Sequence, residues 1–167
     1  MHYTLRMFRN ACVALVLACC APLALAVTVP LHGSISISEQ VIPVGATECD
    51  LIGLVSGTGV LAPLGPVTLA STDCINVEAD GLYTFGSTAI VLTTATGERL
   101  LATYSGTLSP TAIPGTYTIS GGFAILGGTG RFAKVSGGGG TIQGHEAIDP
   151  FAGMGTGQVQ LRGTLSF

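Results

Sequence analysis

The final ten residues of the chain alternate strictly between polar and apolar side chains. Polar residues occupy every second position from Gln158 to Ser166. Apolar residues or glycine stand between and after them, at Val159, Leu161, Gly163, Leu165 and Phe167. Successive side chains of an extended strand point to opposite faces. This period of two therefore predicts a strand with one buried and one exposed face.

Shorter segments of the same kind, separated by turn residues, fill the chain after residue 26. Isoleucine alternates with serine over 34–38, and 99–108 has an apolar face that includes Tyr104. Within 116–126 the pair Gly121-Gly122 predicts a bulge or bend. No segment after residue 26 shows a sustained helical period. About eight short strands at this spacing predict an all-β domain, either a barrel or a sandwich.

The first 26 residues have the pattern of a secretory signal peptide. Arg6 and Arg9 precede an uncharged apolar run, which ends in the small-residue cleavage site Ala24-Leu25-Ala26. This pattern predicts signal peptide 1–26 and a secreted or periplasmic protein. The alternative is a lipoprotein anchored through Cys19, because the preceding residues loosely fit a lipoprotein box.

The exported part, 27–167, has the size of a single domain, in which 27–50 is predicted as an N-terminal strand and linker. The whole chain carries nine acidic and six basic residues, a formal net charge of −3. Two of the basic residues belong to the signal peptide, so the exported part is more acidic still. An acidic chain without a basic patch lacks the charge that neutralises phosphates, which excludes a nucleic-acid partner.

Two cysteines, Cys49 and Cys74, remain after the signal peptide is removed. An even number of cysteines in an oxidising compartment predicts a disulfide. The alternative is a metal site, since Glu48, Asp50 and Asp73 flank the two thiols. No histidine lies close and the spacing fits no zinc pattern, so neither a metal nor a cofactor is expected.

The sharpest local string is glycine-rich and covers Gly127, Gly128, Thr129, Gly130, Arg131 and Phe132. It predicts a tight turn that enters a strand, with Phe132 starting the next buried row. A phosphate-binding loop is the functional alternative. It is disfavoured because neither Lys-Ser/Thr nor a helix follows the glycines.

This turn, the small-residue stretch 133–137 behind it and the closing Gly-Thr-Leu-Ser-Phe resemble the allene oxide cyclase and dirigent barrel superfamily. The likeness is strongest to small secreted bacterial members of uncharacterised function, and it covers roughly 53–167. The resemblance implies an eight-stranded antiparallel β-barrel with an apolar lumen. Plant members of the superfamily guide phenoxy-radical coupling or cyclise an unstable fatty-acid epoxide. For the transfer of residue roles from the family, only the turn residues match, and in the family these residues are structural.

The weak alternation over 142–146 singles out two candidate catalytic residues, Glu146 and His145. Glu146 falls on the face of Ile142 and Gly144. If that face lines the lumen, Glu146 is a buried carboxyl with a raised pKa that can act as an acid or a base. His145 then points outward, although a slip of one residue reverses the two assignments. The alternative for both is a solvated position at the rim.

Other polar residues are expected to be structural. Asp73, Glu78 and Asp80 are predicted to be solvated acids, because no calcium-binding loop surrounds them. The tyrosines Tyr83, Tyr104 and Tyr117 are predicted to pack in the core with the hydroxyl at its edge. The arginines at 99, 131 and 162 are predicted to lie at or within strands as surface charges.

Several functions are compatible with this pattern. The first expectation is a barrel that binds a small hydrophobic molecule in its lumen. The second is an isomerase or cyclase that resembles allene oxide cyclase, which requires a carboxylate inside the pocket. A small outer-membrane barrel is a third, because the chain closes on an alternating strand that ends in Phe167. An inert structural surface protein is the fourth. No transmembrane helix is expected, and the oligomeric state stays open.

Overall fold

A computed structural model describes residues 27–44 and 48–167. The predicted signal peptide 1–26 and the alternative anchor Cys19 lie outside the described residues. Within the described ranges, no helix is long and apolar enough to cross a membrane.

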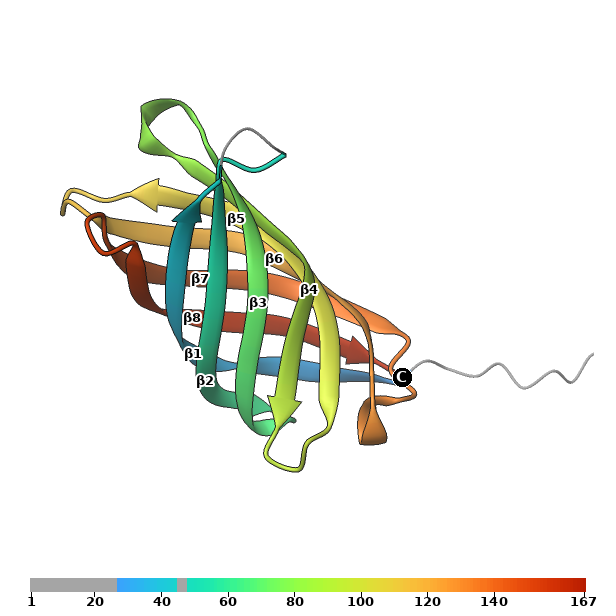
Figure 1. Ribbon diagram of the computed structural model, residues 1–167. Helices are drawn as coiled ribbons and strands as arrows, with labels where there is room; N and C mark the ends of the chain where they lie inside the picture. Colours follow the sequence, from blue (N-terminus) through green and yellow to red (C-terminus); the bar gives the residue numbers. More distant parts are fainter. Residues whose placement is uncertain (1–26, 45–47) are drawn as a thin grey trace, which may run out of the picture.

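Eight antiparallel strands form one closed barrel in chain order, in which β1 pairs with both β2 and β8 (Figure 1). The strands are β1 (Thr28–Pro43), β2 (Leu51–Ala62), β3 (Gly65–Val77), β4 (Tyr83–Thr94), β5 (Arg99–Pro110), β6 (Thr116–Gly128), β7 (Gly137–Asp149) and β8 (Met154–Ser166). Two short 3₁₀ turns, η2 (Ala79–Gly81) and η3 (Gly130–Phe132), lie between strands. The predicted all-β class is confirmed, and of the two architectures that the strand pattern allows, the chain adopts the barrel.

The N-terminal segment is a full part of the barrel wall. β1 is the longest strand, with 16 residues, and closes the barrel by pairing with the final strand. The disulfide predicted between Cys49 and Cys74 is confirmed. It connects the segment that follows β1 to the C-terminal part of β3.

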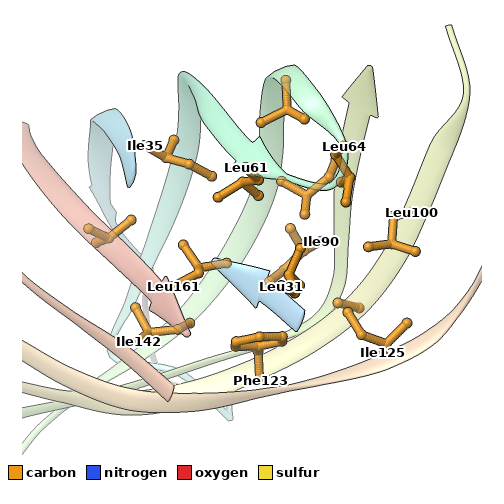
Figure 2. Close-up of a cluster of buried hydrophobic side chains, with 14 of the residues drawn as sticks. Leu31, Ile35, Leu61, Leu64, Ile90, Leu100, Phe123, Ile125, Ile142 and Leu161 are labelled. Carbon is orange, nitrogen blue, oxygen red and sulfur yellow. The ribbon is translucent and has the colours of Figure 1, made fainter. Parts of the chain in front are cut away.

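In the final strand, as predicted, one set of alternating residues is buried and the other is exposed: the apolar side chains face the lumen and the polar side chains face the outside of the barrel. Val159, Leu161 and Leu165 are buried in the lumen, and the polar residues between them are exposed. The lumen of the barrel is therefore mainly apolar, and Figure 2 shows leucine, isoleucine and phenylalanine side chains that meet inside it.

Side chains plug the lumen at the end of the barrel where the chain terminates. Leu31, Leu61, Leu100 and Leu165 are completely buried there. The turn between β2 and β3 adds buried Leu64, and the connection between β6 and β7 adds buried Phe132 and Val135. The complete plug consists of Leu31, Leu61, Leu64, Leu100, Phe132, Val135 and Leu165. This end of the lumen has no room for a ligand.

The glycine-rich turn closes this plugged end, but its course differs from the prediction. Phe132 lies in η3 and does not start a strand, because β7 begins only at Gly137. Gly130 has φ +59°, a conformation that favours glycine, and the chain turns inward there. Phe132 is thereby buried in the plug from the side of the connection.

Arg131 is bound to its neighbours in this turn and is not a free charge on a strand. Its guanidinium lies 3.1 Å from a Glu98 carboxylate oxygen and donates to the Leu64 carbonyl oxygen at 2.8 Å. It also lies over the ring of Phe132, 4.8 Å from the ring centre. These contacts tie η3 to the turn between β2 and β3.

The predicted bulge at Gly121-Gly122 is wrong. These residues pair with β5 in unbroken register, and the extra residue in β6 is Leu126. At Gly121 a Cβ atom would stand 2.4 Å from the carbonyl oxygen of Ser105, so β5 and β6 approach too closely for a side chain. The glycines mark this close approach of two strands.

Candidate functional site

Four polar side chains from alternate strands point into the lumen away from the plugged end. They are Glu39 on β1, Asp73 on β3, Tyr104 on β5 and Glu146 on β7. The three acids are only 4%, 5% and 2% exposed, respectively, and Tyr104 packs against the apolar core. We call these four residues the acidic cluster.

The same period of two that builds the strands points these side chains inward. On β1, Ile35 and Ile37 face the lumen, and Glu39 is the next residue of that face. On β3, Asp73 lies between the inward positions Leu69 and Ile75 in the same way. The polar side chains are therefore held by the barrel wall and not by loops.

The acidic cluster borders a cavity of about 70 Å³ in the lumen. All eight strands contribute to its lining, which is otherwise mainly isoleucine, leucine, valine and phenylalanine. Among the described residues that line the cavity there is no lysine, arginine or histidine. The cavity therefore combines an apolar wall with a concentration of acidic groups that no basic side chain compensates.

Two glycines provide the space that the carboxyl groups of Glu39 and Glu146 occupy. A Cβ atom on Gly53 would stand 1.9 Å from Glu39 Oε1. A Cβ atom on Gly155 would stand 2.2 Å from Glu146 Oε1. Any larger residue at either position would displace the carboxyl group, so β2 and β8 lack side chains where β1 and β7 carry acids.

Glu39 and Glu146 form a carboxyl pair. Burial, followed by the charges of Glu146 and Asp73, raises the pKa of Glu39 to about 8. Burial also raises the pKa of Glu146, while its hydrogen bond with Glu39 acts in the opposite direction. Two ionised carboxylates cannot donate to each other, so the pair shares a proton at neutral pH.

Asp73 belongs to a second hydrogen-bonded group in the cluster. Burial raises its pKa, while hydrogen bonds donated by Tyr104 and Ser71 lower it. The Tyr104 hydroxyl donates to Asp73 Oδ1, and Ser71 Oγ donates to the same oxygen at 3.0 Å. Burial also raises the pKa of Tyr104 far above its usual value, so this residue stays protonated and remains a donor.

The barrel wall is irregular beside this group. Pairing between β3 and β4 shifts between Ala70 and Cys74, and pairing between β4 and β5 shifts between Ser87 and Ile90. Across the irregular stretch, the hydroxyl groups of Ser71 and Ser87 are hydrogen-bonded at 2.8 Å. Bulges of this kind are common beside functional sites, where they redirect side chains.

A shallow open groove lies against the same stretch of wall and shares two lining residues, Phe85 and Tyr104, with the lumen cavity. Their rings pack at 5.6 Å between centres. The cavity and the groove are therefore separated at this point by aromatic side chains.

The structure places the two predicted catalytic candidates on opposite faces of β7. Glu146 is buried in the lumen, whereas His145 is exposed on the outer surface and does not reach the cavity. The carboxyl pair can give or take a proton inside the apolar cavity. Within 27–44 and 48–167, no group of three or more His, Cys, Asp or Glu residues is arranged to hold a metal ion.

The prediction that Asp73 is a solvated acid is wrong, because its position on the inward face of β3 buries it. Glu78 and Asp80, predicted in the same way, are exposed. The hydroxyl of Tyr104 is not at the edge of the core but bonded to Asp73 in the lumen. Glu39 is not among the residues singled out by the sequence, although the Ile35 alternation, continued by two steps, reaches it.

Replacing Tyr104 with phenylalanine is expected to lower the free energy of unfolding by about 1–2 kcal/mol at pH 8. The substitution removes a donor from buried Asp73, whose pKa should then rise further. The loss should shrink as the pH falls, because protonated Asp73 needs the donor less. Urea unfolding at pH 5 and pH 8 measures both effects. If Tyr104→Phe lowers the free energy of unfolding by the same amount in an Asp73→Asn background, the hydrogen bond to Asp73 is not the cause of the destabilisation.

Comparisons of the chain with protein-family models, with curated proteins and with solved structures give no match in any of the three.

Proposed function

We propose that this protein binds a small, mainly apolar molecule in its lumen, with the polar part of that molecule against the acidic cluster. The observation that carries the proposal is the cavity itself, an apolar space on which a few polar groups converge. Ligand sites in proteins commonly combine these two features.

The size of the cavity restricts the ligand. About 70 Å³ holds a few water molecules or a compact molecule of a few heavy atoms, whereas sites for drug-sized ligands measure about 300–1,000 Å³. The long fatty-acid epoxide that the family resemblance suggests is too large for this space. The proposed ligand is therefore short.

The distribution of side chains supports binding more than the two remaining expectations. Outer-membrane barrels carry an apolar band outside and polar residues inside, whereas here the lumen is apolar and the outer face of β8 is polar. An inert structural barrel gains nothing from three buried acids, because burying ionisable groups costs stability. Such groups concentrate at functional sites.

Binding can be tested with xenon and with short apolar molecules, followed through the methyl NMR signals of the protein. The signals of Ile125, Ile142 and Val159, which line the cavity, are expected to shift in a saturable way. The variant Ala102→Leu should fill the cavity and abolish the shifts, since Ala102 is buried in its lining. The matched variant Ala89→Leu adds the same bulk at an exposed position of β4 and should bind normally. Shifts that persist in Ala102→Leu would contradict the proposal.

A second candidate function, an isomerase or cyclase, is favoured by the carboxyl pair. An isomerisation adds a proton at one atom of the substrate and removes one from another, so it consumes no co-reactant. In this reaction the protonated carboxyl of Glu39 donates the first proton and the carboxylate of Glu146 accepts the second.

Small β,γ-unsaturated ketones provide a direct assay, because their conjugated isomers absorb in the ultraviolet. Turnover should exceed the buffer rate and fall at least 100-fold in Glu39→Gln and in Glu146→Gln. The variant Glu78→Gln changes an exposed acid and should leave the rate unchanged. If the wild-type protein and all three variants show the same turnover, the carboxyl pair does not catalyse the reaction.

A further inference from the structure

We propose that the ligand of the lumen carries a protonated amine on a short apolar body, and that this ammonium group donates a hydrogen bond to Glu146 Oε1. This inference rests on the proposed function and names the chemical class of its ligand.

The first observation is an unpaired acceptor. Glu146 is 2% exposed and lines the cavity, and its Oε1 atom has no hydrogen-bond partner. A buried carboxylate oxygen without a donor is unfavourable, and such atoms in native structures have a cause. A ligand with a donor group would satisfy the atom, so the polar end of the ligand is a donor and not an acceptor.

The second observation is the charge around this atom. Glu39, Asp73 and Glu146 converge on the cavity, and no described lining residue is basic. An alcohol could satisfy one oxygen but would leave the negative charge of the site unchanged. An ammonium group has three donors and a positive charge, so it supplies both the missing hydrogen bond to Glu146 Oε1 and the missing positive charge.

The third observation is the surroundings of the cluster. The rings of Phe85 and Tyr104 line the cavity beside the acids, and aromatic faces attract cations. Phe123, Ile125 and Ile142, which Figure 2 shows among the buried side chains, add only apolar surface to the lining of the cavity. A molecule with one cationic end and one alkyl end matches this combination of acidic and apolar lining.

Binding of a cation should release a proton. The proton shared by Glu39 and Glu146 leaves to solvent when the ammonium enters, so that a neutral carboxyl becomes a carboxylate and total charge is conserved. The groups that face Glu39 are Glu146 from β7, Asp73 from β3 and Tyr104 from β5. The adjacent strands β2 and β8 present Gly53 and Gly155, which do not titrate.

The test compares three probes of similar shape at pH 7: n-butylamine, n-butanol and n-pentane, each titrated against methyl NMR signals of the lining residues. The amine should bind at least tenfold more tightly than the alcohol, and the alcohol more tightly than the alkane. Calorimetry of amine binding in phosphate and in Tris, which differ in ionisation enthalpy, should show release of up to one proton per ligand.

Two variants separate the ammonium contact from the apolar contacts. Glu146→Gln should remove the tenfold preference for the amine while keeping the affinity for pentane. Glu39→Gln should abolish proton release. The exposed control Glu78→Gln should change neither quantity.

Equal affinity for amine and alcohol, or an amine preference that survives in Glu146→Gln, would overturn the inference. If pentane and butanol bind and the amine does not, the inference fails and the proposed function stands. If none of the three probes binds, both fail.

Discussion

Raising the pH from 5 to 8 is expected to destabilise the protein, by up to about 1.4 kcal/mol per pH unit for each proton involved. The pKa of Glu39 rises from its ordinary value of 4.5 to about 8 on folding, because burial and neighbouring acids disfavour its charge. The folded protein therefore holds a proton that the unfolded chain releases. This contribution to stability is complete below about pH 4.5 and is lost as the pH rises to about 8.

The pKa values of Glu146 and Asp73 are raised in the same direction, so the three acids of the cluster act together. Glu98, beside Arg131, is the exception among the shifted acids, since hydrogen bonds and charge lower its pKa. Glu98 changes the stability only at pH values below its ordinary pKa, and these lie outside the range from pH 5 to pH 8.

Urea unfolding curves collected between pH 5 and pH 8 provide the measurement. Glu39→Gln should flatten the dependence, because the amide does not titrate, and the exposed variant Glu78→Gln should preserve it. A stability that is constant or rises over this range would mean that the acidic cluster does not hold its proton.

Removal of the disulfide is expected to lower the free energy of unfolding by about 3–4 kcal/mol. Cys49 and Cys74 are 25 residues apart, and a crosslink of this span restricts the unfolded chain by about that amount in the chain-entropy model. The double variant Cys49→Ser/Cys74→Ser and the reduced wild-type protein should show similar losses in urea unfolding.

A reductant should have no effect on the double variant, which controls for other actions of the reagent. Cys74 directly follows Asp73 on β3, so the crosslink also fixes the strand that carries one acid of the cluster. A loss below about 1 kcal/mol would contradict the expectation that the crosslink acts by restricting the unfolded chain.

The two ends of the lumen differ in what they contribute. The plugged end is filled with leucines and sealed by η3, which provides stability through apolar burial. The opposite half contains the cavity and three acids whose burial costs stability. Such a division is expected where a fold supports a site that is not optimal for stability.

Much of the fold could be predicted from local pattern. The alternation of 158–167 predicts β8, and that of 34–38 predicts the middle of β1. The even pair of cysteines predicts the disulfide. These predictions succeed because strand period and thiol pairing depend on neighbouring residues or on simple counting.

The details that failed depend on contacts between strands. Gly121-Gly122 has the composition of a bulge, but glycine is needed there because β5 approaches closely, and no local sequence pattern shows this approach. Phe132 has the position of a strand start, but the chain buries it through η3. Asp73 has the neighbours of a solvated acid, but the face of β3 on which it lies is the lumen.

The sequence by itself determined that the chain after residue 26 is built of two-faced strands, and in β7 it assigned Glu146 and His145 to opposite faces. Only the tertiary structure decided that Glu39, Asp73, Tyr104 and Glu146 line one cavity in the lumen, with Gly53 and Gly155 leaving room for the carboxyl groups of Glu39 and Glu146. The reason is physical: the period of a strand specifies the face of a residue. Its height in the barrel depends on the register with both neighbouring strands, which is fixed only when the sheet closes.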